Sequence, residues 1–307
     1  MTGEFELIAE ITDGLAAGED ILLGPGDDAA VIRPDGDLVV TTDVLIENVH
    51  FRRSWSQAFQ VGRKAVAVNV SDVESMGARP SSIVIGLAIP RDLEPSWVRD
   101  FSKGVADECS RANVSLVGGD LSSAAQISLC VTAFGHLEGR EAITRAGARV
   151  GDQVAVCGRL GWAAGGLLVL QRGFGSPKDL VREQQCPTVP YGQGAVAAAH
   201  GAHAMIDISD GLLQDLGHLC ERSGIGINLD SASMEIPDGL IRLGAATGKE
   251  PLGFVLTGGE DHALAAAFPD AAALSDGWHR MGTVIPGSQV LVDGAVWEGA
   301  PGWDHFA

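Results

Sequence analysis

The chain has 307 residues, more than one ordinary hydrophobic core supports, and a length prior of roughly 150 residues per domain favours two domains. Hydrophobic residues make up 46 %, aromatic residues only 5 %, and there are 41 glycines, which is typical of an α/β core of Val, Ile, Leu and Ala with many tight turns. The 40 acidic residues against 21 basic ones give a formal net charge of −19, which excludes the class of proteins that bind nucleic acid through a basic surface.

The acidic excess also constrains which ligands the chain can bind. So many carboxylates repel ATP, and binding it therefore requires divalent cations between its oxygens and the protein. The five cysteines, at positions 109, 130, 157, 186 and 220, form no C-x-x-C pair and predict neither a zinc site nor disulfides. The first residues lack a basic and apolar leader, and no apolar run approaches ~18 residues, so we expect a cytoplasmic protein without membrane contact.

The first half of the chain alternates strands and helices in the order β-β-α-β-α-β-β. Alternating polar and apolar residues predict the strands, and apolar residues at helical spacing predict the helices. Four of the five strands are expected over residues 31–32, 38–40, 83–89 and 126–134, and the helices over residues 58–76 and 96–111. A charged, glycine-punctuated segment over residues 137–151 then marks a boundary between domains of residues 1–137 and 138–307.

The second half repeats the alternation of strands and helices. The pattern predicts helices over residues 162–171, 194–200 and 212–222, and strands over residues 154–156, 205–206, 225–229, 263–268 and 290–292. Residues 177–192 contain three prolines and are predicted to form a loop. The whole chain therefore has the pattern of an α/β (α+β) protein with two domains.

Six short motifs place a carboxylate beside Gly, Ser or Thr next to an apolar segment. A single Asp in such a motif is more often only a turn former or a helix N-cap. Six of them are more than turns require, and strand ends in α/β sheets are where ligands bind. The motifs are Gly26-Asp27-Asp28, Thr41-Thr42-Asp43, Ser71-Asp72, Gly118-Gly119-Asp120, Asp207-Ile208-Ser209-Asp210 and Gly258-Gly259-Glu260-Asp261.

Asp72 is the motif residue that a structural role explains least well. It lies in an otherwise apolar helix, on the face that Asn69 and Met76 share. A carboxylate on the packed face of a helix is costly unless it is paired or binds a metal ion. Mg²⁺ prefers oxygen ligands and is usually held by one or two carboxylates together with phosphate oxygens, so scattered single aspartates suit it. The motifs therefore predict Mg²⁺-assisted binding of a phosphate compound.

Taken in order along the chain, the motifs resemble those of the thiamine-monophosphate kinase family, and they cover nearly the whole sequence. The resemblance also includes Asn48-Val49-His50-Phe51, residues 64–72 and Gly211. The family belongs to the aminoimidazole-ribonucleotide-synthetase-like group, which implies a two-domain α/β fold with dimerisation through the N-terminal domain. It also implies direct, in-line transfer of the ATP γ-phosphoryl group to thiamine monophosphate, at a site with several Mg²⁺ ions. A role for K⁺ stays open.

Carried over motif by motif, the resemblance implies roles for individual residues. Four aspartates would carry catalysis by holding cations between the two polyanions, namely Asp43, Asp72, Asp120 and Asp210. The full set of metal positions would be Asp28, Thr41, Thr42, Asp43, Asp72, Asp120, Asp207 and Asp210. The nucleotide would contact Gly119, Asp120, Arg145 and Ser209, and the thiamine end would contact His50, Glu260 and Trp303.

Two alternatives to the kinase interpretation stay open. The chain could be another ATP-using enzyme of the same group, although a selenophosphate synthetase is disfavoured because no Cys lies in the first hundred residues. It could also be a non-catalytic protein that binds divalent cations or nucleotides. Turnover separates these classes, because losing the Asp72 carboxylate would abolish ATP use by an enzyme and only weaken binding by a passive protein.

Overall fold

The computed structural model describes residues 8, 11–12, 17–25 and 29–303, and the chain divides into two compact units. Unit 1 comprises residues 1–73 and 78–140, and unit 2 comprises residues 74–77 and 141–307. The structure divides the chain between residues 140 and 141, and the sequence predicts a domain boundary between residues 137 and 138. Residues 74–77, which the sequence assigns to the first domain, belong to unit 2.

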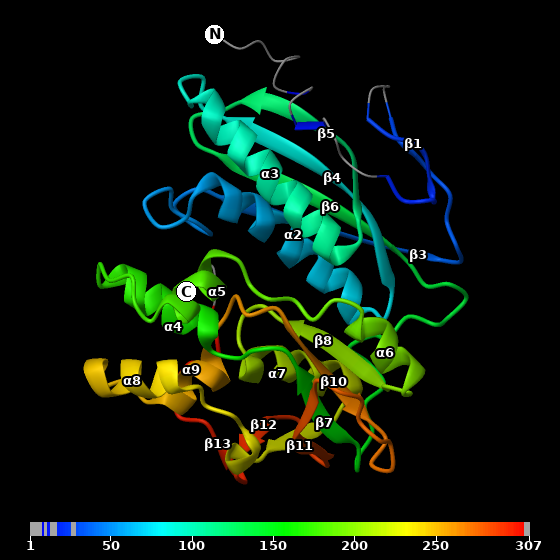
Figure 1. Ribbon diagram of the computed structural model, residues 1–307. Coiled ribbons are helices and arrows are strands. Elements are labelled where there is room, and N and C mark those ends of the chain that lie inside the picture. The colour runs from blue at the N-terminus through cyan, green and yellow to red at the C-terminus, as the bar shows by residue number, and fades with distance from the viewer. Residues whose placement is uncertain (1–7, 9–10, 13–16, 26–28, 304–307) are drawn as a thin grey trace. The chain divides into compact units, whose positions relative to one another are not determined.

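Unit 1 is built around a four-stranded sheet with two helices on one face (Figure 1). Strands β4 and β5 are parallel, whereas β6 pairs antiparallel with both β3 and β4. The strand order is β3 (Leu38–Ile46), β6 (Ser128–His136), β4 (Arg79–Ile89) and β5 (Ser115–Ser123). The helices are α2 (Ala58–Ser75) and α3 (Pro95–Ala112), and β1 (Ile21–Leu23) pairs with β2 (Val31–Ile32) as a separate ribbon.

The two helices of unit 1 approach each other closely at a pair of glycines. A Cβ atom on Gly62 of α2 would overlap the carbonyl oxygen of Phe101, and one on Gly104 of α3 would overlap that of Phe59. The backbones are therefore in direct contact at the crossing, which only glycine allows. This contact fixes the position of α2, the helix that carries Asp72.

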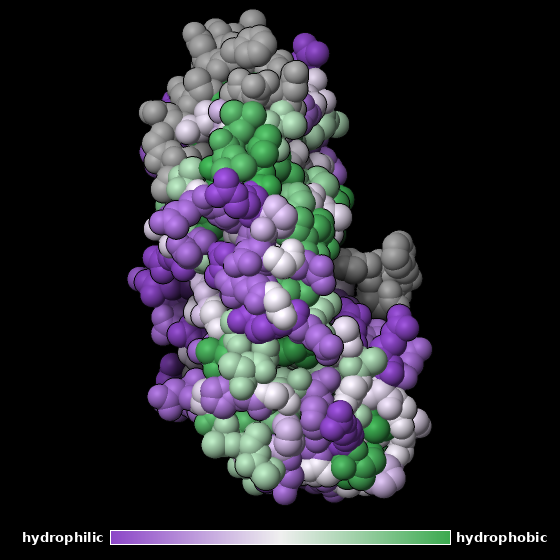
Figure 2. Space-filling model, turned by 90° about the vertical axis from the view of Figure 1, so that its right-hand side faces the viewer, coloured by the Kyte–Doolittle hydropathy of each residue, from purple (hydrophilic) through white to green (hydrophobic). Residues whose placement is uncertain are grey.

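The opposite face of the unit 1 sheet is exposed. Along β3, side chains alternate between the helix side and the open side, and Val40 and Val44 on the open side are 56 % and 48 % exposed. Cys130 of β6 lies beside Val44 on the same face and is also exposed. In the view of Figure 2, hydrophobic surface (green) lies among polar surface (purple) in the upper part, over unit 1, and again in the lower part. Among the described residues of unit 1, the helices therefore cover one face of the sheet.

Unit 2 contains a seven-stranded mixed sheet. Most neighbours pair antiparallel, and β12 with β9 is the parallel pair among them. The strand order is β13 (Ala295–Val296), β12 (Val290–Val292), β9 (Gly226–Leu229), β11 (Trp278–Ile285), β7 (Gln153–Cys157), β10 (Ala263–Phe268) and β8 (Ala204–Ile208).

Helices cover both faces of the unit 2 sheet, because its central strands are apolar on both sides. Alternate residues of β7, β8 and β10, such as Val154, Ile206 and Ala265, join the larger core. This core also includes side chains from α4 (Trp162–Gln171), α5 (Lys178–Gln185), α7 (Leu212–Ser223), α8 (Asp238–Thr247) and α9 (Pro251–Thr257). The other face packs Met205 and Phe268 against α6 (Gln193–Ala199).

Several elements differ from the sequence prediction. The expected loop over residues 177–192 contains α5, and the segment between the strands predicted at residues 225–229 and 263–268 contains α8 and α9. The sequence pattern also did not predict strand β11 (Trp278–Ile285). Among the described residues, no helix is both long enough and apolar enough to cross a membrane.

Candidate functional site

In unit 1, two of the predicted metal-binding aspartates lie where β3 packs on α2. The hydroxyl of Thr41 donates a hydrogen bond to Asp72 Oδ2 at 2.8 Å, across the interface between strand and helix. The backbone N–H of Asp43 donates to Asn69 Oδ1 at 3.0 Å, from the same face of α2. Thr41 and Asp43 are two residues apart, so both face the helix. The structure therefore brings Thr41, Asp43 and Asp72 together.

Asn69 holds this arrangement and is absent from the predicted site residues. Its side chain is fully buried, and its amide also donates to the carbonyl oxygen of Ala65 at 2.9 Å. With both ends bonded, the amide has one orientation, which fixes the backbone at Asp43. A polar residue three positions before Asp72 on an apolar helix face was the signal for it in the sequence.

Thr42 and Asp120 lie on the other face of the unit 1 sheet. The Thr42 hydroxyl donates to the carbonyl oxygen of Val131 at 2.9 Å and accepts a hydrogen bond from Thr132. The strand register pairs Val44 with Cys130, Cys130 with Gly86 and Gly86 with Asp120, so Asp120 shares the open face with Val44. Within one chain, the structure therefore does not bring the Thr42 hydroxyl or the Asp120 carboxylate to Asp43 and Asp72.

The Gly118-Gly119-Asp120 motif lies inside β5 (Ser115–Ser123), whereas the sequence pattern associated the motifs with strand ends. A Cβ atom on Gly119 would overlap the carbonyl oxygen of Ile85 in the neighbouring strand, so packing of β5 on β4 requires glycine there. The Asp120 side chain is exposed and accepts a hydrogen bond from the Ser122 hydroxyl at 2.7 Å. The packing of β5 on β4 therefore explains why residue 119 is glycine, independently of phosphate binding.

His50 lies in the loop that follows β3 in unit 1. Its Nδ1 accepts a hydrogen bond from the backbone N–H of Ile46 at 3.0 Å, which fixes the ring. The carbonyl oxygen of His50 accepts a hydrogen bond from the buried ammonium group of Lys64 at 3.2 Å. Lys64, the first residue of the motif that ends in Asp72, thus ties α2 to the loop that carries His50. Asp28, another predicted metal position, lies outside the described residues.

In unit 2, two motifs that lie fifty residues apart in the sequence form one pair of adjacent loops. Strands β8 and β10 pair antiparallel with Ile208 opposite Ala263, so the segment after β8 meets the segment before β10. The backbone N–H of Glu260 donates to the carbonyl oxygen of Ser209 at 2.7 Å. A Cβ atom on Gly259 would lie 2.7 Å from the same oxygen, so the close approach depends on glycine.

Glu260 has a backbone conformation that side chains rarely adopt. Its φ angle is 69°, and that of His262 is 52°. A non-glycine residue in this region costs on the order of 1–3 kcal/mol, and such residues cluster at functional sites. The buried His262 ring lies 3.1 Å from Asp207 Oδ2, so the second strained residue contacts a predicted metal position.

Trp303 approaches the same loops from the end of the chain. Its backbone N–H donates to the carbonyl oxygen of Asp210 at 2.9 Å, and its carbonyl oxygen accepts from the Gln214 amide at 2.7 Å. Gln214 also donates to Asp210 Oδ2 at 3.2 Å, and the Trp303 ring is exposed. Unit 2 therefore gathers the predicted positions Asp207, Ser209, Asp210, Glu260 and Trp303.

Arg145 lies near the start of β8, at the opposite end of that strand from this group. The carbonyl oxygen of its neighbour Thr144 accepts from the N–H of Met205 near the start of β8, whereas Ser209 follows the end of that strand. Ser223, at the end of α7, donates its hydroxyl to the Arg145 carbonyl oxygen at 3.0 Å. About 13 Å of strand thus separates the Arg145 backbone from Ser209.

Two buried carboxylates that are absent from the predicted site residues hold the loops of unit 2 in place. Asp215 accepts backbone hydrogen bonds from the Ser209–Gly211 turn, and Asp261 accepts from Gly161 and Ala163 at the start of α4, at 2.5 and 2.9 Å. Burial is the largest cause that raises the pKa of each carboxyl to about 7, and for Asp215 the nearby Asp207 charge is a second cause of the increase. An acidic residue in the first turn of α7 was the signal for Asp215.

We expect replacement of Asp261 by Asn to reduce the pH dependence of stability. Burial raises the pKa of Asp261 from 3.8 to about 7, against the backbone hydrogen bonds from Ala163 and Gly161, which lower it. The stabilising contribution of the protonated form is complete below pH 3.8 and is lost as the pH rises through about 7. The free energy of unfolding of wild type relative to Asp261→Asn should therefore fall by about 2 kcal/mol between pH 5.5 and 7.

Denaturant unfolding at several pH values measures this difference. Asn retains the shape and one acceptor oxygen, so the comparison isolates the proton of the carboxyl group. Asp179→Asn, at an exposed position in the first turn of α5, is the control and should follow the wild-type pH dependence. Parallel curves for wild type and Asp261→Asn would contradict the raised pKa.

The oxygen donors in both units fit a hard divalent cation. Unit 1 supplies two carboxylates and a threonine hydroxyl, and unit 2 supplies the carboxylates of Asp207 and Asp210. Within the described part of the chain, no three His, Cys, Asp or Glu side chains converge closely enough to hold a metal ion by themselves. This donor set suits Mg²⁺ bound by one or two carboxylates together with phosphate oxygens, and does not suit a closed structural metal site.

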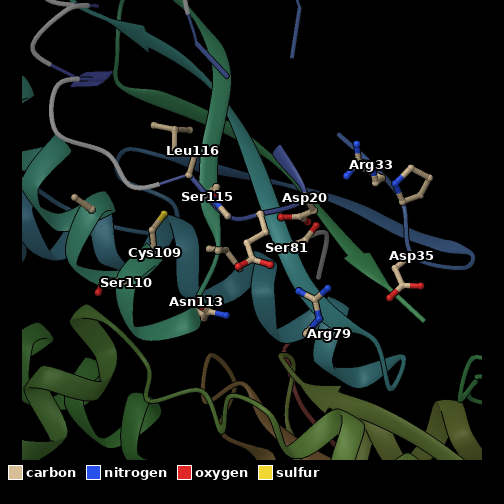
Figure 3. Close-up of a pocket in the computed structure, with 16 residues that line it drawn as sticks. Asp20, Arg33, Asp35, Arg79, Ser81, Cys109, Ser110, Asn113, Ser115 and Leu116 are labelled. Carbon is tan, nitrogen blue, oxygen red and sulfur yellow. The ribbon is translucent and has the colours of Figure 1, made fainter. Parts of the chain in front are cut away.

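A cavity of about 1010 Å³ in unit 1 is lined by none of the predicted site residues that the structure describes (Figure 3). It lies between the end of α3, the start of β5 and the segment around β1 and β2, and Asp20, Arg79 and Ser115 are among its lining residues. Acidic and basic side chains both line it, so its charge selects no single class of ligand. The cavity is therefore distinct from both groups of motif residues.

Comparisons with known proteins agree with the arrangement of motifs. Residues 26–137 match the family model of the AIR synthase related protein N-terminal domain, and residues 149–289 match that of its C-terminal domain. The chain is 43 % identical to thiamine-monophosphate kinase of Mycobacterium tuberculosis, over 99 % of this chain and 92 % of that protein.

Solved structures give the same result. The crystal structure of thiamine-monophosphate kinase from Stenotrophomonas maltophilia is similar to this chain with a TM-score of 0.81 and 34 % identity, over 95 % of each chain. A structure of AaThiL complexed with AMPPCP and TMP is similar with a TM-score of 0.80 and 35 % identity, over 99 % of this chain and 97 % of that one.

Proposed function

Because this chain belongs to the thiamine-monophosphate kinase family, we propose that it transfers the γ-phosphoryl group of ATP to thiamine monophosphate and forms thiamine diphosphate. The observation that carries the proposal is the pairing of the two loops in unit 2. The 2.7 Å hydrogen bond from the Glu260 N–H to the Ser209 carbonyl oxygen joins the loop that carries Glu260, whose carboxylate suits the cationic thiazolium, to the loop of Ser209, which we assign to the nucleotide. The relative that is complexed with AMPPCP and TMP supports the same pair of substrates.

The chemistry of the acceptor explains why the site consists mainly of carboxylates. Thiamine monophosphate already carries an anionic phosphate at neutral pH, so no general base is needed to activate it. The barrier is the repulsion between two polyanions, and positioning with charge neutralisation dominates phosphoryl transfer. We expect direct transfer without a phosphorylated protein intermediate, and rapid-quench labelling with γ-labelled ATP would detect such an intermediate.

The metal positions follow from the two groups of carboxylates. We propose that Asp43 and Asp72 in unit 1, and Asp207 and Asp210 in unit 2, hold several Mg²⁺ ions, which supply charge neutralisation for the phosphate oxygens. The hydrogen bonds from Thr41 and Gln214 orient two of these carboxylates before any cation binds. The oxygen-only donor set supports Mg²⁺ over softer metals.

The direct test is an assay of the purified chain with Mg-ATP and thiamine monophosphate, in which thiamine diphosphate is measured. Thiamine itself is the control acceptor and should give no product, and EDTA should abolish the reaction. ATP consumption without thiamine diphosphate would identify another ATP-using enzyme of the group. Nucleotide binding without turnover would identify a passive binding protein. Replacing K⁺ by Na⁺ in the buffer tests the monovalent cation requirement.

We also propose that the protein is a cytoplasmic homodimer formed through the open face of the unit 1 sheet. Val40 and Val44 on that face are about half exposed, and a second copy is the partner that the family resemblance implies. Asp120 lies on the same face, so dimerisation would place it against the partner subunit. Light scattering should give the mass of a dimer for wild type and of a monomer for Val44→Lys. A monomeric wild type would overturn this assignment.

A further inference from the structure

Asp215 is an acidic residue in the first turn of α7 whose side chain turns back toward the preceding loop. Its Oδ2 atom accepts hydrogen bonds from the backbone N–H groups of Ser209, Asp210 and Gly211, at 3.0, 3.1 and 3.0 Å. The residue is only 3 % exposed. One buried oxygen therefore binds three successive N–H groups of the loop that contains two predicted site residues.

This arrangement determines the path of the loop backbone. Three successive N–H groups can point at one atom only if the chain curves around that atom, as it does in anion-binding turns. Gly211 has a φ angle of 132°, which permits the curve, and a Cβ atom there would lie 2.9 Å from the backbone of Thr257. Once the curve is fixed, the directions of the Ser209 and Asp210 side chains follow from the backbone.

A helix cap alone does not require a residue of this kind. Ser, Thr or Asn at the N-cap satisfies the first N–H groups of a helix without a buried charge. Here the N-cap is Gly211, which has no side chain, and the carboxylate is buried near two other aspartates. Burying a third carboxylate beside Asp207 and Asp210 is costly, so its presence favours a role in the site over a role in helix stability.

We propose that Asp215 is a positioning residue of the phosphoryl-transfer site, which holds the Ser209–Asp210 backbone in the conformation that binds the nucleotide and its cations. This inference rests on the proposed function for the identity of the ligands. Asp215 itself touches neither substrate nor cation. Its contribution is made through the three backbone hydrogen bonds, and it prevents the loop from reorganising when the ligands bind.

The test compares Asp215→Ala and Asp215→Asn with Asp152→Ala. Asp152 is the matched control, because it is 4 % exposed and also accepts a backbone hydrogen bond, from Arg149 at 2.8 Å. It precedes β7 at the opposite end of the strands from Ser209, since Gln153 pairs with Phe268 and Ile208 with Ala263. The measurements are the melting temperature, kcat and KM for both substrates, and calorimetric binding of AMPPCP with Mg²⁺.

Asp215→Ala should lower kcat and the affinity for AMPPCP with Mg²⁺ by about 10²-fold each, with a smaller change in KM for thiamine monophosphate. Asp215→Asn retains an acceptor oxygen for the three N–H groups and should stay within about tenfold of wild type. Asp152→Ala should lower the melting temperature to a similar extent as Asp215→Ala and retain wild-type kinetics and binding.

Three results would overturn the inference. The first is an Asp215→Ala protein with wild-type kcat and nucleotide affinity. The second is an Asp152→Ala protein with the same kinetic and binding losses, which would mean that lost stability explains them. The third is an Asp215→Asn protein as defective as Asp215→Ala, which would mean that charge matters and the hydrogen bonds do not. If Asp215→Ala does not fold, Asp215→Asn and the binding measurement decide.

Failure of the proposed function gives a different pattern. A wild-type protein that makes no thiamine diphosphate but binds AMPPCP with Mg²⁺ would refute the kinase activity. The loss of binding in Asp215→Ala relative to Asp152→Ala would then still report whether Asp215 positions the loop.

Discussion

Asp72→Asn is expected to lower kcat for thiamine diphosphate formation by roughly 10²–10³-fold while the protein stays folded. The substitution removes the negative charge that we assign to cation binding. It keeps the shape of the side chain and an oxygen that can accept the hydrogen bond from the Thr41 hydroxyl, which is 2.8 Å long in the structure. The kinetic assay and a melting curve of the same preparation measure the two effects separately.

The control for this prediction is Asp100→Asn on α3. Asp100 is an exposed carboxylate that pairs with Lys103 on the same helix, so its loss should change neither kcat nor the melting temperature measurably. An Asp72→Asn enzyme with wild-type kcat would show that the carboxylate on α2 has no part in the reaction. A large drop in melting temperature would instead indicate that Asp72 is mainly structural.

Gly104→Ala is expected to reduce the free energy of unfolding by about 2 kcal/mol or more. Alanine normally stabilises a helix relative to glycine by roughly 0.5–1 kcal/mol. Here the added methyl group overlaps the carbonyl oxygen of Phe59, so α2 and α3 must separate. Because α2 carries Asp72 and Asn69, activity should fall together with stability. Denaturant unfolding and the kinase assay measure both quantities.

Gly217→Ala on α7 is the same chemical change, and it is expected to raise stability instead of lowering it. Apart from the backbone of α7 itself, no atom of the described residues lies within 4 Å of a Cβ built on Gly217, so the methyl group fits without displacement. The variant should be more stable than wild type by up to about 1 kcal/mol and should retain its activity. If Gly104→Ala were as stable as Gly217→Ala, that result would contradict the close contact between α2 and α3 at Gly104.

The missed helices α5, α8 and α9 share a feature at their start. The prolines of residues 177–192 were interpreted as loop residues, yet α5 has Pro177 at its N-cap, and likewise α8 has Pro237 at its N-cap and α9 has Pro251 in its first turn. At these positions the missing N–H needs no partner inside the helix, and the fixed φ angle suits a helix start. These prolines therefore mark helix starts, whereas proline interpreted only as a helix breaker predicts loops there.

By itself the sequence determined the local features and the chemistry of this protein. Residue periodicity predicted the helix that carries Asp72 and the buried strands β7 and β10, because burial leaves a local pattern in the chain. The order and residue types of the acidic motifs indicated the kinase family, its substrates and an oxygen-only metal chemistry. None of these conclusions requires knowing which distant residues touch.

Only the tertiary structure decided which side chains meet. The pairing of β8 with β10 brought Glu260 to Ser209, and strand register placed Asp120 on the opposite face of its sheet from Asp43. The supporting roles of Asn69 and Asp215 likewise depend on a strand or loop that packs beside them. Such contacts arise from pairings between distant segments, which periodicity along the chain does not encode. The sequence therefore indicated the chemistry, and the fold decided which residues lie together.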